Sequence, residues 1–121
     1  YEISECLVGS EMCIRDSEDI DQAIRRVGLE PTDKRTFRKY SLGMKQRLML
    51  AQAIMEQPDV LLLDEPTNAI DKKGVELVHQ IMSEEASRGA IVLLASHVDY
   101  DIRSLCSKVF LIEKGKMQLE V

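Results

Sequence analysis

Two adjacent carboxylates, Asp64 and Glu65, follow directly on an uninterrupted apolar run at residues 60–63. An apolar run without polar alternation predicts a strand that is buried on both faces of a parallel sheet. Ligands of open α/β sheets bind at the carboxyl ends of such strands, so this strand would bring both acids to a ligand. One carboxylate suits Mg²⁺, which prefers oxygen ligands, and the second can polarise a water molecule. The simpler alternative is a strand that ends in a turn, with Asp64 capping the next element.

A segment upstream of this strand predicts an anion site. Ser41, Leu42 and Gly43 precede a stretch that is compatible with a helix, residues 44–55. Ser41 is a favourable N-cap residue, and Gly43 permits close approach of the backbone. The unpaired N–H groups of a first helical turn and the helix dipole attract anions. Taken alone, a Ser-x-Gly before a helix is more often a simple cap, and the two carboxylates downstream are what favour the anion site.

Four segments, in this order along the chain, resemble motifs of the nucleotide-binding domains of ABC-type ATPases. Residues 40–47 (YSLGMKQR) are similar to the LSGGQ signature with its basic-Gln-Arg continuation, and residues 61–66 (LLLDEP) are similar to the Walker B strand with its catalytic glutamate. Residues 68–71 (NAID) are similar to the D-loop, and His97, after a second apolar run, is similar to the switch histidine. The resemblance covers residues 18–120.

The resemblance implies ATP as the substrate and Mg²⁺ as the cofactor, with three residues acting in the chain's own site. Asp64 would hold Mg²⁺ through water. Glu65 would act as the general base or orient the water that attacks the γ-phosphate. His97 would bind the γ-phosphate and hold Glu65 in place.

The resemblance also implies that some residues act on the ATP of a second subunit. Ser41 and Gly43 would contact the γ-phosphate of ATP bound to the opposite subunit, and Asp71 would reach across the dimer. The signature segment departs from the family pattern at two positions, where Leu42 replaces the first glycine and Met44 replaces the glutamine. This form is familiar from exporter-type members, and it leaves side-chain contacts from position 44 open.

One part of the family pattern is missing, because the chain contains no G-x-x-x-x-G-K-[ST] phosphate loop. The chain therefore resembles the C-terminal half of the domain: an α/β fold, a partial P-loop NTPase (ABC ATPase) sheet with flanking helices and the Walker A half missing. Residues 18–57 would end the helical subdomain with the signature helix, and residues 58–121 would form the core. Residues 1–17 resemble a translated sequencing adapter and are interpreted as a non-native extension, with a genuine short helix or strand as the alternative. We expect such a sheet to expose apolar faces, and the chain alone to hydrolyse ATP weakly or not at all.

The periodicity of apolar residues indicates which elements carry these motifs. It predicts helices at 18–27, 44–57, 72–88 and 98–107 and strands at 60–63, 90–96, 108–113 and 116–121. The alternation of strand and helix predicts a parallel sheet, and the last two strands predict a hairpin. The helix with the signature segment is apolar on much of its circumference and should be largely buried. His79 lies off the apolar face of its helix and receives no role.

Composition limits the partners and the location. A net charge of −5 is not the balance of a nucleic-acid-binding protein, so no nucleic acid is expected. No apolar run approaches the roughly 20 residues that span a bilayer, so a transporter would need a separate membrane-spanning permease beside a second nucleotide-binding domain. We expect a cytoplasmic protein that is peripheral at the inner face of the cell membrane. The three cysteines show no metal-binding spacing, and Cys106 is expected to be a small buried residue.

These features favour the ATP-hydrolysing subunit of an exporter-type ABC transporter, in which hydrolysis at a head-to-tail dimer interface drives transport. Two alternatives stay open. One is a non-transport ABC ATPase, either a translation factor or an SMC-type protein, although residues 18–39 show no long heptads of the kind expected in the latter. The other is a catalytically incomplete regulatory half-domain, against which the presence of both Glu65 and His97 argues.

Overall fold

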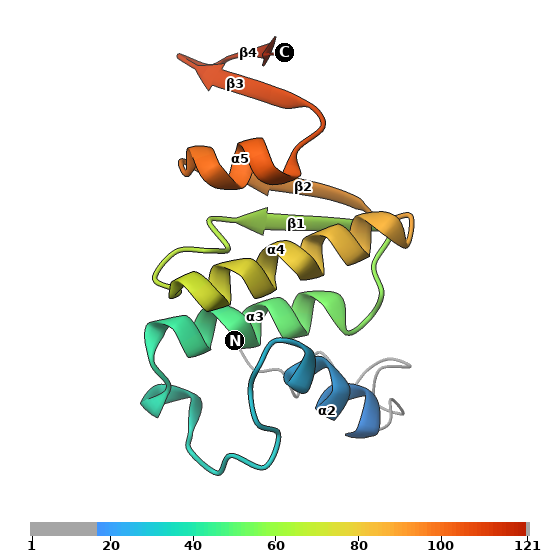
Figure 1. Cartoon of the computed structure of the whole chain (residues 1–121), viewed down its shortest axis with the longest axis vertical. Coiled ribbons are helices and arrows are strands. Elements are labelled where there is room, and N and C mark those ends of the chain that lie inside the picture. Colours follow the sequence, from blue (N-terminus) through green and yellow to red (C-terminus); the bar gives the residue numbers. More distant parts are fainter. Residues whose placement is uncertain (1–16, 121) are drawn as a thin grey trace.

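The computed structural model describes residues 17–120, whose path is shown in Figure 1. In chain order the elements are α2 (Ser17–Arg26), η2 (Phe37–Lys39), α3 (Leu42–Ile54), β1 (Val60–Asp64), α4 (Lys72–Ser87), β2 (Ile91–Ala95), α5 (Asp99–Leu105), β3 (Val109–Glu113) and β4 (Lys116–Glu120). Every predicted helix and strand is present, with ends that shift by a few residues at most. The interpretation of residues 1–17 falls outside the described residues, except for Ser17. No helix within 17–120 has both the length and the apolar character that crossing a membrane requires.

β1 and β2 form a parallel sheet, which confirms the predicted fold class. Their register runs from Val60↔Ile91 to Asp64↔Ala95. Parallel strands need a crossover connection, and α4 provides it and packs on one face of the sheet (Figure 1). Leu61 of β1 is buried in a cluster that includes residues of α4. The register brings the carboxyl ends of both strands to the same edge.

The other face of this sheet is exposed. Its side chains are between 50% and 70% exposed, and they belong to Val60, Leu62, Ile91 and Leu93. The prediction of a strand buried on both faces is therefore wrong for the described chain, because the helices that it contains cover one face only. The expectation that the sheet exposes an apolar face agrees with the structure.

β3 and β4 form the predicted hairpin as a second, antiparallel sheet of two strands. Lys114 and Gly115 connect them, with φ angles of +50° and +76°. Two-residue hairpin loops favour positive φ at both positions, because that backbone twist matches the twist of the strands. The hairpin is largely exposed and lies apart from the β1–β2 sheet in Figure 1.

Helix α3 begins two residues earlier than predicted. Ser41 is its N-cap, and the Ser41 Oγ accepts a hydrogen bond from the Met44 N–H at 3.2 Å. The buried side chains of the helix are those of Leu50, Ala51 and Ile54, which pack in the same cluster as α2. Leu42 and Met49 are 62% and 58% exposed, and the remaining positions of α3 are only half-buried, so the prediction that this helix is largely buried is wrong.

A cluster of charged side chains, which we call the Glu85 clamp, joins α2 to α4. The carboxylate of Glu85 is 2% exposed and pairs with Arg26 of α2 at 2.7 Å and with Arg88 at 2.8 Å. Arg26 also pairs with Glu84 at 2.9 Å. Arg88 donates a further hydrogen bond to the carbonyl of Pro58 at 2.6 Å, in the connection that leads to β1. Burial by itself would raise the pKa of the Glu85 carboxyl, but the hydrogen bonds from Arg26 and Arg88 outweigh it and hold that pKa below its ordinary value.

Replacing Gly74 with alanine is expected to destabilise the protein. A Cβ at this position in α4 would lie 2.1 Å from Ile70 Cγ2 and 2.9 Å from Asp71 Oδ1. Both neighbours are held in place, because Ile70 packs against the core and Asp71 caps α4. Overpacking of this kind typically costs about 1–3 kcal/mol, which thermal or urea unfolding would detect. Lys73→Ala, at the adjacent exposed position, serves as the control and should change the free energy of unfolding much less; equal effects would contradict the prediction.

Candidate functional site

The residues with predicted catalytic roles meet at the carboxyl edge of the β1–β2 sheet. Asp64, the last residue of β1, is the register partner of Ala95, the last residue of β2. Glu65 and His97 follow in the two loops that leave this edge. The backbone N–H of Glu65 donates to the carbonyl of Ala95 at 2.8 Å, which extends the pairing of the strands into the loop.

Glu65 and His97 are in direct contact. The backbone N–H of His97 donates to Glu65 Oε1 at 3.0 Å, and His97 Nδ1 contacts the same oxygen. The Glu65 side chain is 27% exposed and that of His97 is 94% exposed, so the pair faces solvent and is accessible to a ligand. Glu65 Oε2 forms no hydrogen bond within residues 17–120. The structure thus brings together the two residues for which the sequence predicted a catalytic role.

The backbone of Glu65 is held in an unusual conformation. Its φ angle is +48°, in the left-handed region that a residue with a side chain rarely adopts. Its carbonyl accepts hydrogen bonds from Gln46 Nε2 at 3.0 Å and from the Asn68 N–H at 3.1 Å. Such backbone strain persists only where the surrounding contacts impose it, and it occurs preferentially at functional sites. The sequence pattern predicted no role for Gln46, although its place in the basic-Gln-Arg continuation of the signature segment was a usable signal.

Asp64 is suited to hold a magnesium ion. Its carboxylate is exposed at the end of β1 and forms no hydrogen bond or ion pair with any other described residue. Mg²⁺ commonly binds one or two carboxylates and takes its remaining ligands from water and phosphate oxygens. Within residues 17–120 no group of three or more His, Cys, Asp or Glu side chains could enclose a metal ion. The single carboxylate of Asp64 therefore fits a magnesium ion that takes its other ligands from a phosphate and from water. It does not fit a metal ion that is held by protein ligands alone.

The start of α3 packs against the segment that precedes α4. A Cβ at Gly43 would lie 3.0 Å from the carbonyl oxygen of Ala69, so this close approach favours glycine. Asp71 caps α4 by accepting a hydrogen bond from the Gly74 N–H at 3.0 Å, and it pairs with Arg47 of α3 at 3.3 Å. The Asp71 side chain nevertheless remains 71% exposed. Gly43 and Asp71, two of the residues predicted to act on a second subunit, therefore lie on neighbouring segments.

A buried carboxylate for which the sequence predicted no role contacts the two loops that leave this edge. Asp101 of α5 is fully buried. One of its oxygens accepts a hydrogen bond from Thr67 Oγ1 at 2.5 Å and a longer one from Ser96 Oγ at 3.4 Å. Burial raises the pKa of the nearby Cys106 thiol, and the charge of Asp101 adds to that effect. Cys106 was expected to be buried, but in the structure it is only half-buried.

His79 also contacts Asp101. It was predicted to lie off the apolar face of its helix and to have no role, but in the structure it is buried. The residue is 9% exposed. Its Nε2 is 2.6 Å from Asp101 Oδ1, and its ring stacks on Tyr100 with centroids 5.3 Å apart. The periodicity of apolar residues does not detect such a position, because the packing partner of His79 is a carboxylate that comes from another helix.

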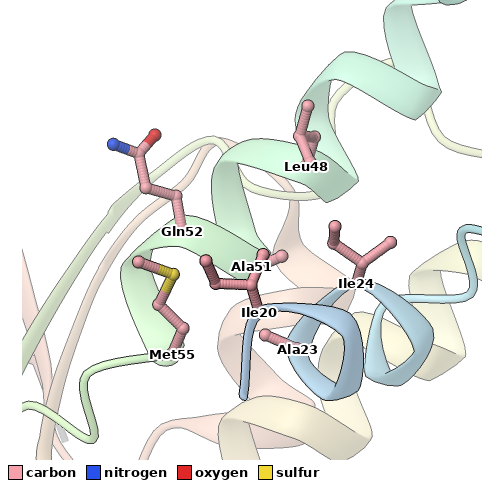
Figure 2. A pocket seen from close by; sticks show the side chains of 7 residues that line it. All are labelled: Ile20, Ala23, Ile24, Leu48, Ala51, Gln52 and Met55. Atoms are coloured by element: carbon pink, nitrogen blue, oxygen red, sulfur yellow. The ribbon is translucent and has the colours of Figure 1, made fainter. Parts of the chain in front are cut away.

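An apolar hollow between α2 and α3 is a poor candidate for the site. Figure 2 shows the side chains that line it, from Ile20, Ala23, Ile24, Leu48, Ala51, Gln52 and Met55. None of them is charged, and the amide of Gln52 points away from the other lining side chains (Figure 2). Phosphate groups are bound by cations and by N–H donors, so the hollow lacks the chemistry that a nucleotide requires.

The matching family model and two of the matching curated relatives are named as ABC transporter or transport ATP-binding proteins. The family model described as ABC transporter matches residues 2–68. The uncharacterized ABC transporter ATP-binding protein YybJ of Bacillus subtilis (strain 168) is 51% identical over 105 residues, which are 87% of this chain and 48% of YybJ. The lantibiotic transport ATP-binding protein SrtF of Streptococcus pyogenes is 37% identical over 97 residues, which are 80% of this chain and 42% of SrtF.

Solved structures show the same arrangement of elements. The structure of cbiO1 from Clostridium perfringens, described as part of the ABC transporter complex cbiONQ, matches with a TM-score of 0.66 at 28% sequence identity. The match covers 84% of this chain and 41% of cbiO1. The chain therefore spans less than half the length of each of these relatives.

Proposed function

This chain belongs to the ABC transporter family, and from that premise we propose that it is the C-terminal part of an ATP-hydrolysing subunit of a transporter. The observation that carries the proposal is the contact between Glu65 and His97 beside the free carboxylate of Asp64 at one edge of the sheet. Residues 18–57 would then complete the helical subdomain, and residues 58–121 would belong to the catalytic core.

Glu65 is proposed as the general base for hydrolysis of the γ-phosphate. His97 engages Oε1 of its carboxylate, which leaves Oε2 to accept a proton from the attacking water. The water oxygen then bonds to the γ-phosphorus, the bond from that phosphorus to the β–γ bridging oxygen breaks, and ADP leaves. Asp64 would hold Mg²⁺ beside the phosphates, where the ion neutralises their charge. His97 is also proposed to bind the γ-phosphate through Nε2, since Nδ1 faces Glu65; donation by both ring nitrogens requires the doubly protonated ring.

Ser41, Gly43 and Asp71 are proposed to act on the ATP of a second nucleotide-binding domain. The Ser41 hydroxyl accepts the capping hydrogen bond from Met44, so its own hydrogen remains available to a phosphate oxygen. The absence of a side chain at Gly43 allows a ligand, as well as Ala69, to approach the first turn of α3. The first-turn N–H groups and the dipole of α3 favour an anion there.

The remaining parts of the proposal concern the assembly. A separate permease subunit would place this protein in the cytoplasm, peripheral to the inner face of the membrane. The names of the relatives support a transport role, since SrtF is a lantibiotic transport ATP-binding protein and cbiO1 is part of an ABC transporter complex. The Leu42 and Met44 form of the signature segment supports an exporter.

ATP hydrolysis by two versions of the protein tests the proposal. Sequencing of the source locus upstream of the codon for Ser17 should reveal a glycine-rich Lys-Ser/Thr loop and would define the full-length subunit. That subunit is expected to hydrolyse ATP with Mg²⁺. The 121-residue chain should be at least about 100-fold slower, because it lacks the phosphate-binding donors of that loop. Rapid hydrolysis by the 121-residue chain that Glu65→Gln abolishes would contradict the proposal that this chain is only the C-terminal part of the catalytic domain. An inactive full-length subunit would contradict the proposal that the protein hydrolyses ATP.

A further inference from the structure

The buried carboxylate of Asp101 contacts three separate parts of the chain. Its partners are Thr67 in the loop between β1 and α4, Ser96 in the loop between β2 and α5, and His79 in α4. A buried charge with fewer partners would be costly. Replacing a buried ion pair by apolar side chains of similar volume often leaves stability unchanged or improves it. A contribution to stability is therefore a poor explanation for the polar contacts of Asp101. A better explanation is that these hydrogen bonds hold the contacted segments in a fixed orientation.

The two loops that Asp101 contacts are those that carry the candidate catalytic pair. Thr67 comes two residues after Glu65, and Ser96 immediately precedes His97. Ser96 Oγ also accepts a hydrogen bond from the Val98 N–H at 2.9 Å, which restrains the backbone on the far side of His97. One buried carboxylate thus restrains both loops against each other.

We propose that Asp101 is a positioning residue, which holds Glu65 against His97 through Thr67 and Ser96. The proposal rests on the function proposed above, because Glu65 matters for rate only if it acts on the attacking water. His79 completes the arrangement by engaging the other oxygen of Asp101, and its ring is itself fixed by stacking on Tyr100. Thr67 and His79 engage different oxygens of this carboxylate, and together these two contacts fix its orientation.

Two substitutions of Thr67 in the full-length subunit separate the hydroxyl from the shape of the side chain. Valine keeps the shape and removes the O–H donor, whereas serine keeps the donor and removes a methyl group. Thr67→Val is expected to lower kcat for ATP hydrolysis about 10- to 100-fold, the effect of a catalytic group displaced by about 1 Å. The KM for ATP should change little, and Thr67→Ser should retain most of the wild-type kcat.

Amide hydrogen exchange of His97 in the nucleotide-free subunit supplies a measure that does not depend on activity. This N–H donates to Glu65 Oε1, so its protection reports on the contact that Asp101 is proposed to maintain. Thr67→Val should speed exchange at His97, and Thr67→Ser should not. If Thr67→Val fails to fold, Ser96→Ala replaces it, with a smaller expected change in the same direction.

The outcomes distinguish this inference from the proposed function. A lower melting temperature with wild-type kcat and wild-type exchange at His97 would show that the network is only structural and would overturn the inference. If Glu65→Gln leaves hydrolysis unchanged, the catalytic assignment of Glu65 fails, and the exchange at His97 still decides whether Asp101 maintains the contact.

Discussion

Replacing Glu65 with glutamine in the full-length subunit should reduce kcat for ATP hydrolysis by about 10²- to 10⁴-fold, the usual contribution of a general base. Glutamine is nearly the same size as glutamate, and its carbonyl oxygen can still accept the hydrogen bond from the His97 N–H. It cannot accept the proton of the attacking water. Binding of ATP should therefore remain close to that of the wild type. Steady-state kinetics and equilibrium binding of ATP, measured side by side, would show the two effects separately.

Glu76→Gln provides the matched control for this experiment. Glu76 is an exposed residue of α4 and forms no hydrogen bond or ion pair with other described residues. The same chemical change there should leave kcat within about twofold of the wild type, because surface substitutions away from specific contacts have small effects. A Glu65→Gln subunit that keeps most of its activity would rule out Glu65 as the base.

Replacing Glu85 with alanine is expected to produce the largest loss of stability among the charged residues considered. Removal of one partner from a fully buried ion pair costs about 3–5 kcal/mol, because an uncompensated charge stays behind. The side chains of Arg26 and Arg88 are 34% and 33% exposed, so both can partly return to water. We therefore expect a smaller loss, about 2–3 kcal/mol, in the free energy of unfolding measured with urea.

Glu84→Ala is the control, because Glu84 also pairs with Arg26. Its side chain is 46% exposed, and exposed ion pairs contribute about 0–1 kcal/mol. The difference between these adjacent glutamates should come from burial and not from the number of ion pairs. Equal losses for the two variants would show that the Glu85 clamp contributes no more than a surface pair.

The Glu85 clamp should also make stability depend on pH. Burial raises the pKa of Glu85, but the hydrogen bonds from Arg26 and Arg88 lower it further, so the folded protein holds this pKa below its ordinary value of 4.5. The unfolded chain then binds a proton more readily than the folded one. The stabilisation is fully present above pH 4.5 and is lost as the pH falls through the lower pKa of the folded state. Urea unfolding at a series of acidic pH values should show a shallower decline for Glu85→Gln than for the wild type.

The order and type of the elements were predictable because their signals are local. Ser41 caps α3 and Asp71 caps α4, as their residue types indicate. Two apolar runs with a helix between them predict a parallel pair, and the structure contains β1, α4 and β2 in that arrangement. The exposed face of the sheet was harder to predict, because the pattern of apolar residues does not reveal whether a covering layer belongs to the same chain.

The buried charged residues were not predictable from periodicity. Glu85 and His79 lie on the packed side of α4, yet neither is apolar. Glu85 is tolerated there because Arg26 reaches it from α2, and His79 is tolerated because Asp101 reaches it from α5. Each partner is distant in sequence, so the compensation for burial exists only once the helices have packed.

The chemical groups of the candidate site, and their order after the strands, were predictable from the sequence. Its local patterns place Asp64 and Glu65 after one strand and His97 after the next, and parallel pairing then brings them to one edge. The packing of the elements was needed to show that His97 contacts Glu65, that Gln46 holds the Glu65 carbonyl and that Asp101 contacts both loops. The physical reason is that hydrogen bonds between side chains act over about 3 Å, whereas a periodic pattern specifies a face of an element and not the distance to its neighbour.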